Sequence, residues 1–297
     1  MTKCNICGNE HSRPVFEMKG FQLVSCTSCG LVYVVNPPDA AFLEKLYSSA
    51  GSNYHTQLRD PASVQYQRIK RISANHLAFV KRIAKSGHLV DVGCSTGQFM
   101  ALAQHNGFDC AGIEFSRDSA DFVVAETGLP VEHGSIHDSQ LPAESCELLT
   151  MFDVIEHVPD PAADLAKAYE LLKPGGWLVL STPNIDGLFP KASYPLANKL
   201  GYWPHPEAPH HLYQFSVKTL GALVEKAGFE VGLVEHCNID LAYSFGTLST
   251  LIRMPKRLAY AMVFSPLAKL GPLVGAGDWF YMAVRKPALA GSMASAA

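Results

Sequence analysis

Four of the eight cysteines are spaced as in a metal site. They form two Cys-x-x-Cys pairs, Cys4 with Cys7 and Cys26 with Cys29, and a glycine follows each pair. Two residues between thiolates let one tight turn present both sulfurs to an ion, so two such turns predict a tetrahedral four-thiolate zinc site. Zinc there would be structural, because a closed site leaves no coordination position open. A chance pairing and a redox Cys-x-x-Cys motif are the alternatives.

The segment Val-Asp-Val-Gly-Cys-Ser-Thr-Gly at 90–97 joins a buried strand to a glycine-containing turn and a helix. Glycines in such a turn let the backbone approach a ligand closely beside a helix N-terminus. A nicotinamide enzyme would need Gly-x-Gly-x-x-Gly, and this turn offers only Gly-x-Ser-x-Gly. Glu114 ends the next predicted strand, where a carboxylate can accept both hydroxyl groups of a ribose. Each piece alone could be structural, but in this order they indicate a nucleoside site.

An alternating α/β fold is needed to position these residues. Strands are predicted at 88–93, 109–114, 148–152, 177–182 and 229–235, and helices at 40–47, 66–84, 98–106, 116–127, 164–172 and 217–227. Strands separated by helices form βαβ units, and right-handed crossovers give a doubly wound parallel sheet with its ligand at the carboxyl ends of the strands. The helix at 66–84 is basic, which indicates a solvated face or a phosphate contact.

A resemblance emerges from the ordered set Asp91-x-Gly93-x-x-x-Gly97, Glu114 and the run from 152 to 184. This set resembles class I S-adenosylmethionine-dependent methyltransferases over about residues 85–240. The resemblance implies a seven-stranded Rossmann-like sheet ending in an antiparallel pair of strands at 229–235 and 279–285.

The same resemblance implies S-adenosylmethionine as the cofactor and a set of residues that bind it. Asp91, Gly93 and Gly97 would form the pocket on the methionine side, and Glu114 would hold the ribose. The remaining candidates are Ser135 and Ile136 flanking the adenine, Cys94 in the turn, and Phe152 at a strand end.

Methyl transfer is a displacement at a sulfonium, and an acceptor hydroxyl or carbon acid must also lose a proton. The first candidate cluster, Asp153-x-x-Glu156-His157, resembles the E-x-x-E-H pattern that holds a divalent metal in ubiquinone-biosynthesis O-methyltransferases. The resemblance implies Mg²⁺ at Asp153, Glu156 and His157, with His157 also a catalytic candidate. Alternatively, Glu156 and His157 only shape the helix start and the cofactor pocket.

The second cluster spans residues 209–216 and carries His210, His211 and Tyr213. It resembles the E-H-x-x-x-F-S motif of zinc-containing sugar C-methyltransferases, which also have an N-terminal four-cysteine segment. On that resemblance His211 is the better-placed base, with His210 and Tyr213 nearby. The alternative is that one of these histidines caps the helix that starts near Ser216.

The chain divides into a small appendage and one large domain. We expect a zinc ribbon at 1–35, a helical linker or cap at 36–86, the methyltransferase domain at 87–284 and a tail at 285–297. Within the domain, 185–215 is predicted to be a long aromatic lid loop without regular structure. The apolar insert at 238–278, with basic Arg253, Lys256 and Arg257, is predicted to form helices that cover the sheet end or line a substrate pocket. Peripheral membrane contact is the alternative.

Composition limits the function classes. The 297 residues are 48% hydrophobic and 17% charged, so a sizeable core can form. The net charge of −3 argues against a chain built to coat nucleic acid. Neither an apolar signal region nor a run of 18 apolar residues is found, so we expect a cytoplasmic protein.

The leading hypothesis is methylation of a small molecule, such as a sugar nucleotide, a natural-product intermediate or a lipid intermediate. An RNA methyltransferase docking through the ribbon and a non-catalytic nucleoside-binding module are the alternatives.

Overall fold

Alternating strands and helices dominate the computed structural model, which describes residues 3–39, 42, 58–238 and 244–288. The ordered elements are β1 (Ser12–Met18), β2 (Phe21–Cys26), β3 (Val32–Val34), α3 (Val64–Val80), β4 (Gly87–Val92), α4 (Gln98–His105), β5 (Phe108–Glu114), α5 (Arg117–Thr127), β6 (Val131–His133), η2 (Ile136–Asp138), β7 (Cys146–Phe152), α6 (Pro161–Leu171), β8 (Leu172–Pro183), α7 (Leu188–Leu200), β9 (Tyr213–Gln214), α8 (Val217–Lys226), β10 (Glu230–Cys237), α10 (Leu248–Arg253), α11 (Pro255–Leu270), η3 (Gly271–Val274) and β11 (Trp279–Arg285).

The central sheet has seven strands in the order β10-β11-β8-β7-β4-β5-β6. Neighbouring strands from β8 to β6 are parallel, whereas β11 runs antiparallel to both β8 and β10. The predicted doubly wound, seven-stranded α/β fold with an antiparallel pair at one edge is therefore confirmed. From β4 the chain adds β5 and β6 on one side and then β7 and β8 on the other. In sheets of this kind the ligand-binding crevice lies where the strand order reverses, here at the carboxyl ends of β4, β5 and β7.

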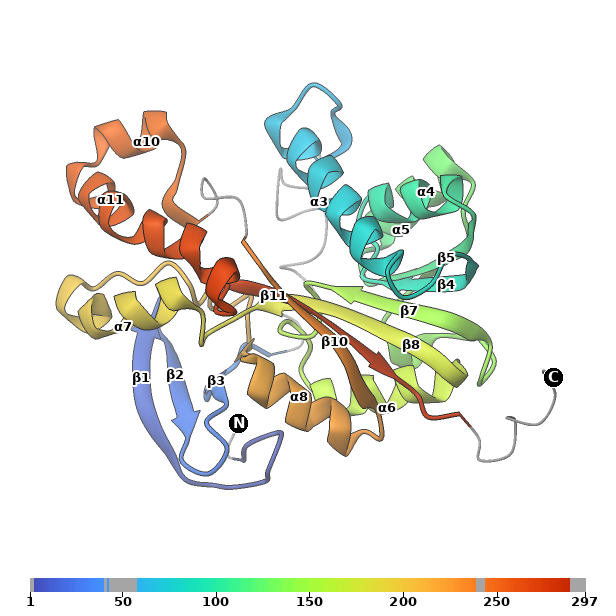
Figure 1. Ribbon diagram of the computed structural model, residues 1–297, viewed down its shortest axis with the longest axis horizontal. Coiled ribbons are helices and arrows are strands. Elements are labelled where there is room, and N and C mark those ends of the chain that lie inside the picture. Colours follow the sequence, from blue (N-terminus) through green and yellow to red (C-terminus); the bar gives the residue numbers. More distant parts are fainter. Residues whose placement is uncertain (1–2, 40–41, 43–57, 239–243, 289–297) are drawn as a thin grey trace.

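Helices cover both faces of this sheet (Figure 1). On one face α3 and α4 pack on the sheet, and Leu77, Val80 and Met100 belong to that core. On the other face α6 and α8 contribute Leu165 and Leu220 to a second, larger core. Helix α8 begins at Val217 as predicted, behind the cap formed by Ser216. Helix α6 begins three residues before the predicted position 164, because the Asp160 side chain caps it ahead of Pro161 at its first position.

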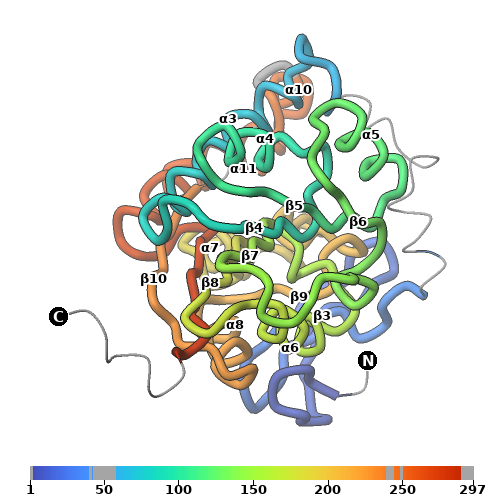
Figure 2. Tube along the Cα trace, turned by 90° about the vertical axis from the view of Figure 1, so that its right-hand side faces the viewer, coloured from blue at the N-terminus to red at the C-terminus, as the bar shows by residue number. Residues whose placement is uncertain are grey.

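The N-terminal strands form a separate antiparallel sheet in the order β1-β2-β3-β9. Its last strand, β9, comes from the second histidine cluster, and it joins the sheet through the pairs Val32–Gln214 and Tyr33–Tyr213. Figure 2 shows β3 and β9 close to α6, on the side of the central sheet away from α3. The larger core includes Cys4 and Tyr33 as well as residues of α6 and α8. The N-terminal segment therefore packs into the body of the protein.

Two regions differ from the sequence prediction or lie outside the described residues. Residues 185–215 were expected to lack regular structure, but they contain the thirteen-residue helix α7 and strand β9. The helices predicted for the apolar insert are present as α10 and α11. The predicted helix at 40–47 lies outside the described residues except for Phe42, and so do residues 289–297 of the predicted tail. Among the described helices, none has both the length and the apolar composition to cross a membrane.

Candidate functional site

The turn between β4 and α4 is shaped so that only glycine fits at two positions. Gly93 and Gly97 have φ values of +75° and +72°. A Cβ at Gly93 would lie 2.6 Å from a methyl carbon of Val154, and one at Gly97 would lie 2.7 Å from a methyl carbon of Val123. Both values are far below an ordinary carbon–carbon contact. The turn is therefore held close to its neighbours, and its backbone lies beside the N-terminus of α4, where the NH groups favour a polar or anionic ligand.

Glu114 ties the end of β5 to this turn. One carboxylate oxygen accepts a hydrogen bond of 2.8 Å from the Ser95 NH, and the other accepts one of 2.8 Å from the Ser116 NH. Burial raises the pKa of Glu114, and these NH groups partly offset the effect. The carboxylate predicted to hold a ribose thus lies directly beside the glycine turn, as that role requires.

Asp91 and Cys94 lie beneath the surface of the turn. Asp91 is buried and accepts a hydrogen bond of 2.6 Å from the Thr150 hydroxyl. Burial raises its pKa to about 7. The Cys94 thiol is also buried, in the core with Met100. Cys94 can therefore offer its backbone to a ligand at the turn, whereas its side chain contributes to packing.

The predicted adenine-side residues follow the short strand β6. The Asp138 carboxylate accepts hydrogen bonds from the Ser135 NH at 2.8 Å and the Ser135 hydroxyl at 2.7 Å. Ile136 is 1% exposed. Ser135 thus opens the short helix η2, and its side chain is already engaged with Asp138, which sequence reasoning did not identify.

Phe152, at the end of β7, lies in an aromatic group that sequence reasoning did not foresee. Its ring centroid is 3.9 Å from that of His76 in α3 and 4.9 Å from that of Phe99 in α4. His76 is 7% exposed, and burial lowers its pKa to about 3. Its Nδ1 has no hydrogen-bond partner in the described part of the chain.

The two predicted histidine clusters meet in space. Ligand atoms of Glu156, His157 and His211 all lie within 4.8 Å of one another, and the two imidazole centroids are 4.7 Å apart. The Leu212 NH donates to the Glu156 carbonyl oxygen at 2.8 Å, which fixes the segment before β9 against the end of β7. A carboxylate and two imidazoles therefore converge at the carboxyl edge of the sheet.

Burial controls the charge of this cluster. It raises the pKa of Glu156 well above its usual value and lowers the pKa of His157 to about 4. Burial and neighbouring imidazoles lower the pKa of His211 well below its usual value. The His157 Nδ1 lies 2.8 Å from the His210 carbonyl oxygen, so this nitrogen donates and Nε2 carries the lone pair of the neutral ring. The Thr182 hydroxyl partly offsets the effect of burial on the pKa of Glu156. Within the described part of the chain, Nδ1 of His211 has no hydrogen-bond partner.

The other predicted members of the clusters have different surroundings. Asp153 accepts hydrogen bonds from the Ser181 hydroxyl at 2.7 Å and from the Trp279 indole NH at 2.8 Å. The third residue beside Glu156 and His157 is therefore His211, and not Asp153 as the sequence motif predicted. The Tyr213 hydroxyl donates to the Pro159 carbonyl oxygen at 3.0 Å, so its side chain anchors β9.

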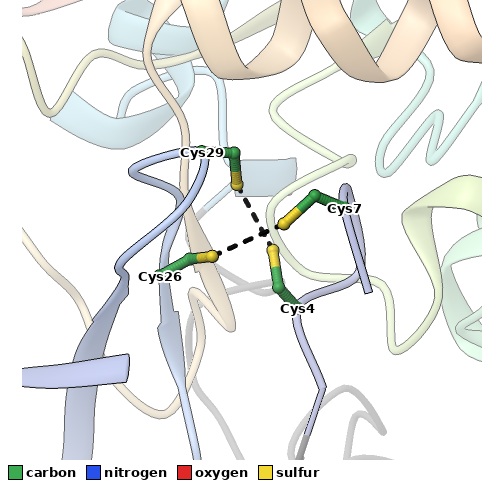
Figure 3. Close-up of side chains that lie close together, drawn as sticks. All are labelled: Cys4, Cys7, Cys26 and Cys29. Atoms are coloured by element: carbon green, nitrogen blue, oxygen red, sulfur yellow. Dashed lines mark hydrogen bonds between the residues drawn. The ribbon is translucent and has the colours of Figure 1, made fainter. Parts of the chain in front are cut away.

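The four paired cysteines converge on one point (Figure 3). The sulfurs of Cys4 and Cys29 are 3.4 Å apart, and those of Cys7 and Cys26 are 3.5 Å apart. Tetrahedral zinc with Zn–S bonds of about 2.3 Å holds its sulfurs at about 3.8 Å. The two glycines that follow the pairs both have positive φ, and each donates its NH to the carbonyl oxygen of the first cysteine of its pair. The donor set and both turns fit a zinc ion.

Burial and backbone NH groups have opposing effects on these thiols. Burial alone would raise the pKa of Cys26, but the NH groups of Cys29 and Ser28 outweigh it and lower the pKa to about 6. Burial raises the pKa of Cys4. The polypeptide thus favours the thiolate form at Cys26, which is the form that binds metal.

Comparison with known proteins agrees with this geometry. Residues 64–234 match the family model described as a methyltransferase domain. The chain is 30% identical over 134 residues to ubiquinone biosynthesis O-methyltransferase of Bordetella avium (strain 197N), covering 42% of this chain and 55% of that protein. It is 39% identical over 103 residues to the enzyme of that name from Methylococcus capsulatus (strain Bath), covering 32% and 43%. The chain thus spans about half the length of the curated relatives it matches.

Solved structures share the fold. A SAM-dependent methyltransferase from Thermotoga maritima aligns with a TM-score of 0.51 at 21% identity, covering 75% of this chain and 95% of that one. The cyclase SpnF aligns with a TM-score of 0.53 at 16% identity, covering 77% and 85%. These likenesses concern the fold alone, whereas the family match spans more than half of the sequence. The glycine turn, its Glu114 partner and that match together place the chain in the class I S-adenosylmethionine-dependent methyltransferase family.

Proposed function

We propose that the protein transfers the methyl group of S-adenosylmethionine to a small-molecule acceptor. The observation that carries this proposal is the meeting of Glu156, His157 and His211 at the edge of the sheet that also carries the glycine turn. When bound, S-adenosylmethionine supplies an electrophilic methyl group. The residues of this chain would align the acceptor with that methyl group and accept the proton that the acceptor loses.

The cofactor residues would divide the work of binding. The backbone of the turn around Gly93 and Gly97 would face the methionine part, and the Glu114 carboxylate would accept the ribose hydroxyl groups. Ser135 and Ile136 would flank the adenine, with Phe152 at the end of β7. The cradle fits such a ligand, because any side chain at Gly93 or Gly97 would clash with Val154 or Val123.

His211 would assist the loss of the acceptor proton. Burial keeps this imidazole neutral near pH 7, so it can accept a proton. His157 would support it, because the bond of its Nδ1 to the His210 carbonyl fixes the ring. His210 would serve through that carbonyl oxygen. The proposal can be tested by screening small hydroxyl and amine compounds with methyl-labelled S-adenosylmethionine, and it fails if no class of acceptor takes up label.

A divalent ion is a second role that the same cluster could support. Two imidazoles and a carboxylate are a common ligand set for transition metals, and the ligand atoms of Glu156, His157 and His211 lie within 4.8 Å of one another. With an ion bound, His211 would be a ligand and not a base, and Asp153 would stay bonded to Ser181 and Trp279. Bound metal and turnover, measured before and after chelation, distinguish the two roles. If His211 is a base, turnover should survive chelation. If an ion is needed, turnover should be lost on chelation and restored by added metal.

The four-cysteine site would hold a structural zinc ion. Its support is the convergence of four sulfurs from two matching turns. A zinc-to-protein ratio of about one in the purified protein is the expected result.

The alternative of an RNA acceptor predicts that RNA binds and that salt weakens the binding steeply, which a filter-binding titration measures. The cytoplasmic location stays a prediction.

A further inference from the structure

The surface of the apolar insert carries a cluster of exposed hydrophobic side chains, which we call the insert face. Large apolar residues are exposed on α10, on α11 and on the following η3 turn. They are Ile252, Met254, Met262, Val263, Leu270, Leu273 and Val274. Met262 and Val263 are 64% and 62% exposed, and Leu273 is 83% exposed. Scattered single residues of this kind need no explanation, but seven within the 23 residues from 252 to 274 are a concentration that favours an interaction site.

Helix α11 already has a buried side that stabilises it. Tyr260, Ala261 and Phe264 pack with Phe189 of α7 in a small core. The exposed residues Met262 and Val263 lie on the opposite side of the same helix. Packing among the described residues therefore does not account for the apolar residues of the outer side. A helix that is apolar on both sides usually contacts a second apolar environment.

The charged residues of the insert itself have one sign. No Asp or Glu occurs in the 37 residues from 241 to 277, although the whole chain has a net charge of −3. Arg253, Lys256 and Lys269 are exposed. The two lysines lie near the two ends of α11, on either side of Met262 and Val263. Arg257 is turned inward and donates to the Tyr202 hydroxyl at 3.1 Å.

We propose that the insert face binds the surface of an anionic lipid bilayer. Met262, Val263 and Leu273 would enter the boundary between headgroups and acyl chains, and Lys256 and Lys269 would reach the lipid phosphates. A second copy of this chain is a poorer occupant. A twofold contact through this face would bring the same cationic residues together, with no carboxylate in the insert to compensate.

The insert face lies at the edge of the sheet that carries the candidate site. The insert follows β10, which is parallel to β8, so it begins at the carboxyl ends of the strands. Figure 1 shows α10 and α11 at that end of the sheet, above α7. Docking would hold the site near the bilayer and favour amphiphilic acceptors. That consequence rests on the proposed methyl transfer, whereas the docking itself does not.

Flotation of the protein with vesicles tests the docking directly. Vesicles of phosphatidylcholine with about one third phosphatidylglycerol should carry the wild type upward, and pure phosphatidylcholine vesicles should carry much less. Val263→Glu removes apolar contact and adds a repelled charge, so binding should fall at least about tenfold. Val124→Glu is the matched control, because Val124 is also an exposed helical valine (45%) but lies on α5, across the molecule. This control should bind as the wild type does.

A Lys256→Gln, Lys269→Gln double variant tests the charge requirement. Each lysine should contribute about fivefold to binding on anionic vesicles, and high salt should reduce the wild-type signal to a similar degree. The proposal is overturned if the wild type stays with the lipid-free fraction, or if both valine variants bind equally. It is also overturned if light scattering shows a dimer that Val263→Glu converts to a monomer. Methyl transfer is measured separately, so failure of docking leaves the proposed function standing.

Discussion

Asp91 is a carboxyl group buried under the glycine turn, and its burial makes the charged form costly. The only side chain that donates to it among the described residues is Thr150. Its pKa is raised from 3.8 to about 7. Because the folded state holds the proton more tightly than the unfolded state, the contribution of Asp91 to stability is greatest below about pH 4 and is lost as the pH rises to about 7.

Asp91→Asn should therefore stabilise the ligand-free protein at high pH. Asparagine keeps the oxygen that accepts from Thr150 but carries no charge. The free energy of unfolding of the variant should equal that of the wild type near pH 4 and exceed it by roughly 2–4 kcal/mol at pH 8. Urea titrations across this range measure the difference. Asp278, whose pKa burial also raises to about 7, keeps part of the pH dependence in both proteins. A constant difference between pH 4 and pH 8 would contradict this origin.

His211 is expected to matter for turnover more than for cofactor binding. His211→Asn should lower the rate of methyl transfer by about 10² to 10⁴, the usual contribution of a general base. Affinity for S-adenosylhomocysteine should stay within about twofold, because His211 belongs to the second histidine cluster and not to the glycine turn. His105→Asn, at the exposed end of α4, is the matched control and should change neither quantity. If His211→Asn weakened both equally, the residue would have only a structural role.

At the level of elements, the β4–α4 turn depends on the close approach of α5. Gly97→Ala should destabilise the protein by about 2–4 kcal/mol, combining a disfavoured φ of +72° with a clash against Val123. Gly128→Ala is the matched control, because Gly128 has a φ of +69° and open space around it. It should cost only the backbone part, about 1 kcal/mol.

A second substitution separates the two contributions at Gly97. Adding Val123→Ala should recover the steric part of the loss in the Gly97→Ala background, as measured by a double-mutant cycle of thermal or urea unfolding. Affinity for S-adenosylhomocysteine should follow the same order. Equal losses from Gly97→Ala and Gly128→Ala would show that the close contact with Val123 is unimportant.

Most elements of the central sheet could be predicted from the sequence because they are long and strongly patterned. β11 matches the predicted range 279–285, and α8 follows its predicted cap at Ser216. Strand β6 has only three residues, none of them buried, so it gave no hydrophobic run to detect. Helix α7 was missed because Pro190 and Pro195 lie in its sequence, and proline normally indicates a helix boundary.

The candidate site could be predicted as separate pieces but not as an assembly. Glu156 and His157 were recognised from one motif and His211 from another, 54 positions further along the chain. Their meeting depends on β9 joining the N-terminal sheet, and this two-residue strand carries no local signal. For the same reason the sequence paired Glu156 with Asp153, its neighbour in the motif, whereas the fold turns Asp153 toward Ser181 and Trp279.

On the scale of the whole molecule, the N-terminal four-cysteine segment (the ribbon) is connected to the histidine cluster. β3 of the N-terminal sheet pairs with β9, which directly follows His211 and Leu212. The Leu212 carbonyl accepts from the Val34 NH at 2.9 Å, while the Leu212 NH donates to Glu156. One residue thus links the ribbon sheet to the end of β7. Order in the ribbon should therefore help to position His211.

Cys26→Ser tests this connection. The variant should lose zinc, unfold at a lower temperature and lose at least about tenfold in turnover, because a structural zinc site contributes directly to folding. Binding of S-adenosylhomocysteine should change by less than about threefold, since β4, α4 and β5 lie in the other part of the fold. Cys110→Ala, a buried cysteine outside the ribbon, should retain the metal. Full turnover in a zinc-free Cys26→Ser protein would disprove the link.

Calorimetric titration with S-adenosylhomocysteine, for the wild type and for Glu114→Gln, tests the central claim most directly. The substitution keeps the size of the side chain and removes the charge that would accept the ribose hydroxyl groups. We predict one site of micromolar affinity in the wild type and binding about 10- to 100-fold weaker in the variant, as expected for the loss of hydrogen bonds to a charged group. Absence of binding to the wild type, or equal affinity in both proteins, would contradict a cofactor site built from the glycine turn and Glu114.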